Sequence, residues 1–333
     1  MKTTYPVNHH AIAKAAELLR AGRLVAIPTE TVYGLGANAS DPKAVRRVFD
    51  TKGRPKQHPV IVHVADTSPI DVALTGWVTD IPDSARTLAK SFWPGPLTMI
   101  LRRGPKAHDG VTGGRDTVGV RVPGHPWALA LVRAFGDGIA APSANHFGHV
   151  SPTTAKHVRD EFGHHVDMIL DGGPCTVGVE STIVDLSGSA PRLLRLGMIT
   201  KHVLETALGM AVSYEVLAQP AHTSEAPGTL ASHYAPAATM TILEKVQLIT
   251  AVAEAQTTKC YPGILSFEPR PKGWPVERWI VTPEKPEKCA RHLYASLRAL
   301  DASSPDRILV ESVPGHGLWS AIADRLQRAA APR

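Results

Sequence analysis

Cysteine is scarce: the 333 residues contain three, Cys175, Cys260 and Cys289, widely spread along the chain. Three scattered cysteines exclude a disulfide-stapled scaffold and a cysteine zinc cluster. No run of 18 apolar residues occurs, which excludes a membrane-spanning helix of ordinary length. The first 22 residues have neither the apolar stretch nor the cleavage site of a secretory leader. We therefore expect a cytoplasmic protein in a reducing compartment, with no membrane partner.

Aromatic residues and the usual phosphate-binding motifs are also missing. Aromatics make up 5% of the chain, and no basic stripe interleaved with aromatics occurs, which argues against a single-stranded RNA platform. The segment nearest to a P-loop, residues 173–178, is followed by Val179 and Glu180 where Lys and Ser or Thr are required. The 16 histidines do not fall at metal-ligand spacing with a carboxylate partner, so we expect no metal ligated by protein side chains.

What the chain does carry is positive charge, concentrated in its first part. The formal net charge is +6, and residues 1–205 account for nearly all of it. Such a field suits anions, including phosphates, carboxylates and nucleic acid, although ordinary surface solubility would give the same excess.

The composition changes near residue 206. No Lys or Arg occurs between Glu205 and Glu244, and residues 218–238 are rich in Pro, Ala, Ser and Thr. This composition is typical of a linker. We therefore predict a catalytic domain at residues 1–207, a linker at 208–238 and a C-terminal domain at 239–333.

Short apolar runs alternate with amphipathic segments on both sides of this linker. In the first part we predict strands at residues 24–27, 60–64, 97–101, 117–122, 168–170, 181–186 and 192–195, and helices at 10–21, 42–49, 84–92, 126–134 and 153–161. After the linker we predict strands at 240–243, 264–267, 279–281 and 307–310, and helices at 246–255, 286–299 and 318–328. Alternation of strands and helices of this kind favours a small parallel α/β domain at the C-terminal end.

Polar residues follow several of the predicted strands directly. The stretch PTETVYGLG follows the strand at 24–27, and Lys52 and Arg54 lie at the end of a predicted helix. Hydroxyls and glycines at strand ends suit a small polar ligand, although a helix cap or tight turn would use the same residues. Arg121 lies in an apolar strand, so its guanidinium needs an anionic partner, which a ligand, Asp116 or Asp185 could provide.

Nine motifs occur in a fixed order along the first part of the chain. They are PTETVYGLG, KGRP, HPVIVHV, WPGPLT, VGVRVPGHP, APSAN, SPT, GVESTIVD and LLRLG. As an ordered set over residues 12–197 they resemble the threonylcarbamoyl-AMP synthase family, the YrdC/Sua5 group. The linker element APGTLASHYAP resembles the long Sua5 subtype. The resemblance implies an α/β fold, with a YrdC-like twisted open mixed sheet and a smaller Rossmann-like C-terminal domain.

The resemblance also implies a reaction. The family joins L-threonine, bicarbonate and ATP into threonylcarbamoyl-AMP and pyrophosphate, a nucleotidyl transfer that feeds the t6A modification at position 37 of tRNA. Mg²⁺ would enter on the ATP phosphates, and the product would pass to the tRNA threonylcarbamoyltransferase, with weak binding of tRNA or double-stranded RNA allowed. An anion that attacks a polyanion needs cations around both partners.

Site residues carried over from the family fall into two sets. L-Threonine would be held by Thr29, His63, Arg121, Ala141 and Ser181. ATP would be held by Lys52, Arg54, His58, Thr117, Ser143, Asn145, Ser151, Arg195 and Tyr234. Within the ATP set, Lys52, Arg54, Ser143 and Asn145 would be catalytic, and Tyr234 would fold back from the linker over the nucleotide.

Three positions depart from the family pattern, and three other functions stay open. His58 replaces the usual Asn, Leu196 replaces a Pro and Thr229 replaces a Met, without loss of a charge that the reaction requires. The alternatives are a carbamoyl-transferring domain that uses carbamoyl phosphate and ATP, an RNA-binding module without catalysis, and a regulatory protein that binds ATP or threonine.

Overall fold

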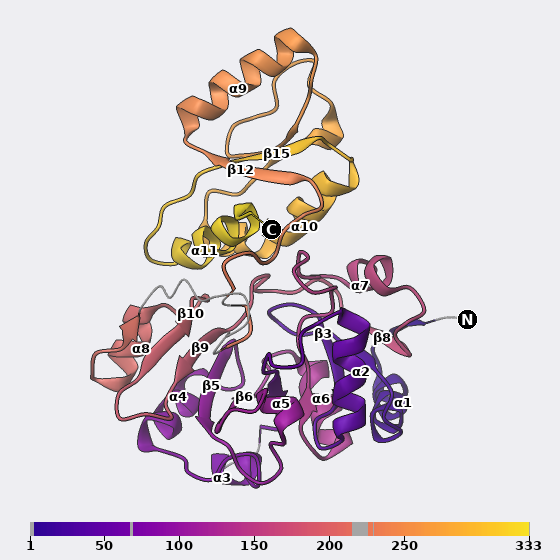
Figure 1. The fold of residues 1–333 in the computed structure, drawn as a ribbon, viewed down its shortest axis with the longest axis vertical. Coiled ribbons are helices and arrows are strands. Elements are labelled where there is room, and N and C mark those ends of the chain that lie inside the picture. Colours follow the sequence, from indigo (N-terminus) through magenta and orange to yellow (C-terminus); the bar gives the residue numbers. More distant parts are fainter. Residues whose placement is uncertain (1–2, 67–68, 215–225, 229, 333) are drawn as a thin grey trace.

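Two sheets of unequal size organise the chain. The structure, a computed structural model, describes residues 3–66, 69–214, 226–228 and 230–332. Figure 1 shows the first two-thirds of the chain gathered in a large lobe and the C-terminal third in a smaller lobe beside it. No helix among the described residues is long and apolar enough to cross a membrane.

The large lobe is built on a mixed sheet. Its strand order in the described part of the chain is β1-β8-β2-β3-β7-β4-β6-β5-β9-β10-β11, with parallel and antiparallel neighbours. The strands are β1 (Thr4–Pro6), β2 (Val25–Ile27), β3 (Gly34–Asn38), β4 (Ile61–His63), β5 (Leu97–Arg102), β6 (Thr117–Arg121), β7 (Ile139–Ala140), β8 (Met168–Asp171), β9 (Thr182–Asp185), β10 (Arg192–Arg195) and β11 (Ser213–Tyr214).

Helices pack around the sheet, and the helix that carries Lys52 leads to Arg54. The helices are α1 (His9–Arg20), α2 (Pro42–Lys52), α3 (Ile70–Leu74), α4 (Asp83–Phe92), α5 (Asp109–Thr112), α6 (Pro126–Phe135), α7 (Ala155–Phe162) and α8 (Lys201–Leu208). The Asp41 side chain caps α2 at Lys43 N, and Gly53 ends it with a φ of 63°. A left-handed residue suits glycine, and here it turns the chain so that Arg54 leaves the helix axis.

The small lobe has a four-stranded parallel sheet in the order β12-β15-β13-β14. Its elements are β12 (Thr239–Leu243), α9 (Lys245–Thr258), β13 (Gly263–Ser266), the 3₁₀ turn η1 (Val276–Arg278), β14 (Trp279–Val281), α10 (Pro286–Ala302), β15 (Arg307–Glu311) and α11 (Trp319–Ala330). The predicted fold class, a mixed α/β sheet followed by a smaller parallel α/β domain, is confirmed.

An apolar interface joins the two lobes. Val32, Val150 and Val179 of the large lobe pack in one buried cluster with side chains of α10 and α11. The lobes are therefore held by more than the chain that links them. β11 lies inside the range 208–238 that we assigned to the linker, yet it pairs with β10 of the large sheet. Residues 215–225 lie outside the described part of the chain. The exact division into domains therefore stays a prediction.

Candidate active site

The site begins at the ends of two neighbouring strands. β4 and β6 run parallel with His63 opposite Arg121 and Ile61 opposite Gly119, so these four positions share one face. Arg121 and His63 are 3% and 4% exposed. A guanidinium this deeply buried needs hydrogen-bond partners on every side.

A narrow cavity of about 50 Å³ lies over this face. Most of the predicted site residues line it: Thr29, Arg54, His63, Arg121, Ala141, Ser143, Ser181, Arg195 and Tyr234. Thr31, Glu180 and His233 also line it; they belong to the motifs PTETVYGLG, GVESTIVD and APGTLASHYAP but were not among the predicted site residues. The fold thus brings residues of both predicted ligand sets to one place.

Lys52 and Asn145 lie behind the lining of this cavity. The Lys52 ammonium donates to the Ser143 carbonyl at 2.5 Å and also to the Asn145 carbonyl. The Asn145 amide donates to the carbonyls of His146 and His149. Both side chains therefore hold the loop that carries Ser143.

The remaining predicted residues outside the lining are His58, Thr117 and Ser151. His58 is buried with its ring edge-on to Phe147. Thr117 begins β6, at the other end of the strand from Arg121. The Ser151 hydroxyl donates to Glu180 at 2.7 Å.

Arg121 finds its anionic partner in Glu30. The distance from Nη2 to Glu30 Oε1 is 2.6 Å, and Arg121 also donates to Thr31 Oγ1 at 3.0 Å. Glu30, and neither Asp116 nor Asp185, is therefore the carboxylate that pairs with Arg121. Burial raises the pKa of Glu30, but the charge and hydrogen bonds of Arg121 lower it by more. The pKa of Glu30 is therefore below its ordinary value.

His63 is a neutral imidazole at physiological pH. Burial lowers its pKa to about 3, and the neighbouring positive charge of Arg121 acts in the same direction. It can therefore act as a hydrogen-bonding group beside Arg121 without adding charge to the cavity.

Two more buried guanidiniums face the cavity. Arg54 donates to the Pro59 carbonyl at 3.0 Å and lies between the rings of Phe49 and Phe147. Burial lowers the pKa of Arg54 to about 10, which leaves it charged at neutral pH. Arg195 donates to the Ser181 hydroxyl at 2.9 Å, so it reaches the predicted threonine set as well.

The linker closes the cavity. Pro227, Gly228 and Tyr234 belong to its lining, and Arg195 donates to the Pro227 carbonyl at 2.7 Å. Tyr234 is 1% exposed and has a φ of 63°, an uncommon backbone conformation for a tyrosine. A cavity for a nucleotide needs several hundred cubic ångströms, roughly 300 or more. The cavity is smaller than that, and Pro227, Gly228 and Tyr234 form part of its wall.

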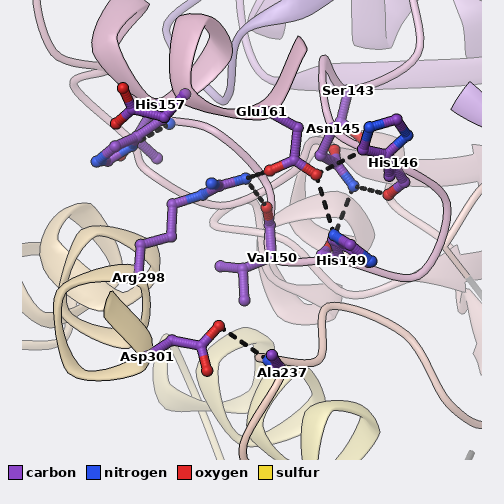
Figure 2. Close-up of polar contacts among 12 residues, drawn as sticks. Ser143, Asn145, His146, His149, Val150, His157, Glu161, Ala237, Arg298 and Asp301 are labelled. Carbon is purple, nitrogen blue, oxygen red and sulfur yellow. Dashed lines mark hydrogen bonds and ion pairs between the residues drawn. The ribbon is translucent and has the colours of Figure 1, made fainter. Parts of the chain in front are cut away.

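Figure 2 shows how the loop after β7 is held from outside the cavity. Glu161 of α7 accepts from the His146 amide at 2.9 Å and faces His149 Nδ1 at 3.0 Å. Arg298 of α10 pairs with Glu161 at 2.8 Å and donates to the Val150 carbonyl. A side chain of the small lobe thus takes part in fixing the loop that runs from Ser143 to Val150.

Fold and site together define a class: an α/β enzyme with a cavity at strand ends that is lined by three buried arginines and by residues of the linker to a second domain. Residues 17–197 match the family described as "Telomere recombination", and residues 199–331 match the family described as "Threonylcarbamoyl-AMP synthase, C-terminal domain". The chain belongs to the threonylcarbamoyl-AMP synthase family, as its motifs predicted.

Full-length relatives agree with this assignment. The threonylcarbamoyl-AMP synthase of Pyrococcus abyssi is 39% identical, over 98% of this chain and 96% of its own. That of Bacillus subtilis is 41% identical, over 98% of this chain and 94% of its own. The solved structure of P. abyssi Sua5 complexed with L-threonine superposes with a TM-score of 0.89 at 37% identity, covering 98% of this chain and 96% of that one. These relatives favour the synthase over the carbamoyl-transfer, RNA-binding and regulatory alternatives.

Proposed function

We propose that the closed cavity is the place where this chain joins L-threonine, bicarbonate and ATP into threonylcarbamoyl-AMP. The observation that carries the proposal is the convergence of three buried guanidiniums, those of Arg54, Arg121 and Arg195, on one cavity. A reaction between a carbamate and a triphosphate brings anions together, and preorganised cations in a water-poor site lower its barrier.

The threonine subsite would lie at the β4–β6 end of the cavity. Arg121 is held in place by Glu30 and Thr31, so its guanidinium is already oriented when a carboxylate arrives. Neutral His63, the hydroxyls of Thr29 and Ser181 and the main chain of Ala141 complete the predicted set. The L-threonine in the P. abyssi structure supports a threonine site in this fold.

The ATP subsite would lie under the linker. Arg54, Ser143, Arg195 and Tyr234 line the cavity directly, while Lys52 and Asn145 hold the loop that carries Ser143. The roles predicted for His58, Thr117 and Ser151 stay predictions, because these side chains lie outside the lining in the closed arrangement. Displacing Pro227 and Gly228 would open the space that they now fill.

The chemistry needs no protein nucleophile. The threonine nitrogen bonds to the bicarbonate carbon with loss of water, which gives a carbamate. A carbamate oxygen then bonds to the α-phosphorus of ATP as the bond to the β-phosphate oxygen breaks, and pyrophosphate leaves with the electron pair. Arg54 and Arg195 would stabilise the charge that develops on the phosphates, so positioning and electrostatics supply the catalysis.

Magnesium enters this scheme as part of the substrate MgATP. The carboxylates near the cavity, Glu30 and Glu180, are each bonded to an arginine, which makes them poor metal ligands. In the described part of the chain no group of three His, Cys, Asp or Glu side chains could hold a metal. Transfer of the product to a tRNA threonylcarbamoyltransferase, contact with tRNA and a cytoplasmic location stay predictions.

Release of pyrophosphate tests the proposal. With MgATP, we expect release only when both L-threonine and bicarbonate are present, and we expect Arg54→Ala to lower it at least about 100-fold, since a lost charge contact costs several kcal/mol in a buried site. Arg46→Ala is the control, because Arg46 lies on α2, the helix that precedes Arg54, with its side chain 67% exposed. Release that continues without threonine would contradict the proposed substrate.

A further inference from the structure

A buried carboxylate connects the cavity with the C-terminal lobe. Glu180 lines the cavity, and its Oε1 accepts from the Ser151 hydroxyl at 2.7 Å. Its Oε2 accepts from the Tyr294 hydroxyl of α10 and from Nε of Arg325 of α11, both at 2.8 Å. One oxygen therefore holds a residue of the predicted ATP set, and the other is held by two residues of the small lobe.

Arg325 makes two further contacts beside the cavity. Its Nη2 donates to the Leu196 carbonyl at 2.8 Å, directly after Arg195 in the chain. Its guanidinium carbon lies 5.1 Å from the centre of the Tyr234 ring. Asp324 completes its partners by accepting from Nη1 at 2.5 Å. Every nitrogen of this fully buried guanidinium is thus bonded.

Holding the two lobes together does not require this polar network. A buried ion pair costs desolvation energy, and apolar side chains of similar size often stabilise an interface as well or better. The apolar cluster around Val32, Val150 and Val179 already joins the lobes. Burial raises the pKa of Glu180, but the charges of Arg325 and Arg195 lower it by more. The Glu180 carboxylate therefore stays ionised. A fully bonded buried network of this kind fixes one arrangement of the groups around it.

We propose that Arg325 and Tyr294 are positioning residues for the ATP subsite, and that they act through Glu180. The proposal rests on the function proposed above. Bonded to both, Glu180 holds Ser151 at a fixed place, while Arg325 fixes the carbonyl beside Arg195 and one face of Tyr234. The C-terminal lobe then contributes to nucleotide binding through Glu180, although none of its described side chains lines the cavity.

The contacts predict which substrate is affected. Ser151, Arg195 and Tyr234 all belong to the predicted ATP set. On the threonine side, Arg121 is oriented by Glu30 and Thr31 of the large lobe. Loosening the Glu180 network should therefore change the KM for ATP more than the KM for threonine.

Steady-state pyrophosphate release by the full-length chain tests this. We expect Arg325→Met, which removes a buried charged hydrogen bond, to raise the KM for ATP about 10-fold or more. Tyr294→Phe removes a neutral one and should raise it about 3-fold. The KM for threonine should change less than about 2-fold in both variants. Arg291→Met is the matched control. Arg291 also lies on α10 and donates across the lobes, to the Thr176 carbonyl at 2.8 Å, but Thr176 is not part of the cavity lining.

A double-variant cycle separates positioning from general loosening. Arg325 and Ser151 bond to different oxygens of Glu180. If Glu180 transmits the effect, Arg325→Met should raise the KM for ATP less in a Ser151→Ala background than in the wild type. Effects that simply multiply, or equal losses in the two KM values, would overturn the proposal.

Two further measurements keep the outcomes distinct. Thermal unfolding of each variant shows whether it is folded; should Arg325→Met fail to fold, Tyr294→Phe and its double with Ser151→Ala decide the question. If the wild type releases no pyrophosphate with threonine and bicarbonate, the proposed function fails. Calorimetric binding of MgATP to the wild type and to Tyr294→Phe then decides this inference, and equal affinities would overturn it.

Discussion

Lys52 shows how a residue can belong to a site without facing its ligand. From the sequence, Lys52 was predicted to bind the phosphates of ATP through its positive charge. In the structure Lys52 is 2% exposed. Its ammonium donates to the carbonyls of Ser143 and Asn145. Burial and the neighbouring charge of Arg54 lower the pKa of Lys52. Its part in the closed site is to hold the loop that contributes Ser143.

The Lys52→Met substitution therefore should damage both stability and activity. It leaves two buried carbonyls without their donor, which should cost about 2–3 kcal/mol of unfolding free energy, and it frees the loop. Urea unfolding and pyrophosphate release measure the two effects. Lys43→Met, at the exposed start of α2, is the control and should change neither. A Lys52→Met protein with wild-type stability would show that the two carbonyl contacts are unimportant.

Sequence motifs identified single site residues better than their partners. Thr29 and Arg121 were selected as polar residues beside or in an apolar strand, Arg54 as a cation at the end of a predicted helix, and Arg195 through the family resemblance. All four line the cavity. The partner of Glu180 could not be found this way, since Arg325 lies 145 positions further along the chain in an ordinary amphipathic helix. A buried acid inside the apolar stretch GVESTIVD was the one available signal.

At the level of elements, the strands that were predicted are those with an apolar run, including the three-residue strands β2 and β4. β5 and β6 lie where their apolar runs indicated, and the helices with clear N-caps lie within a few residues of the predicted bounds. β3 was missed because its residues, GLGAN, have the glycine content of a loop. β7 and β11 have two residues each, too few for any periodicity to appear.

The contact between α7 and the loop after β7 predicts a pH effect. Burial raises the pKa of Glu161, but His149 and Arg298 lower it more, to about 2. A lowered pKa means that the ionised carboxylate stabilises the fold above its unfolded pKa, near 4.3, and that this stability is lost as the pH falls toward 2. Glu161→Gln should therefore cost about 2 kcal/mol at pH 7, with the difference from wild type shrinking below about pH 4.5.

Urea unfolding at pH 7, 4 and 3 measures this difference. Glu17→Gln is the control: Glu17 pairs with Lys14 with both side chains more than half exposed, so its effect should be near zero at each pH. A cost for Glu161→Gln that stays constant from pH 7 to 3 would show that the Glu161 carboxylate is not held in its charged form.

For the whole molecule, sequence composition predicted a linker between two domains but held no information on how the two lobes contact each other. Strand and helix patterns describe faces within one element, whereas the interface combines Val179 of the large lobe with α10 and α11 of the small one. The buried network around Glu180 depends on this docking. Its geometry therefore emerges only when both lobes are folded together.

A chain that ends at residue 214 would test how far the large lobe depends on the small one. Three apolar clusters of the described residues lie entirely within residues 3–214, so the shortened chain should fold on its own. It would expose Val32, Val150 and Val179, which we expect to lower its melting temperature by about 10 °C. It would also lack Tyr234, Tyr294 and Arg325. Turnover should therefore fall at least about 100-fold while circular dichroism still reports folded protein, because the ATP subsite has lost both its cover and its support. Turnover equal to that of the full chain would mean that the large lobe organises the nucleotide by itself and that the contacts of Arg325 serve only to hold the lobes together.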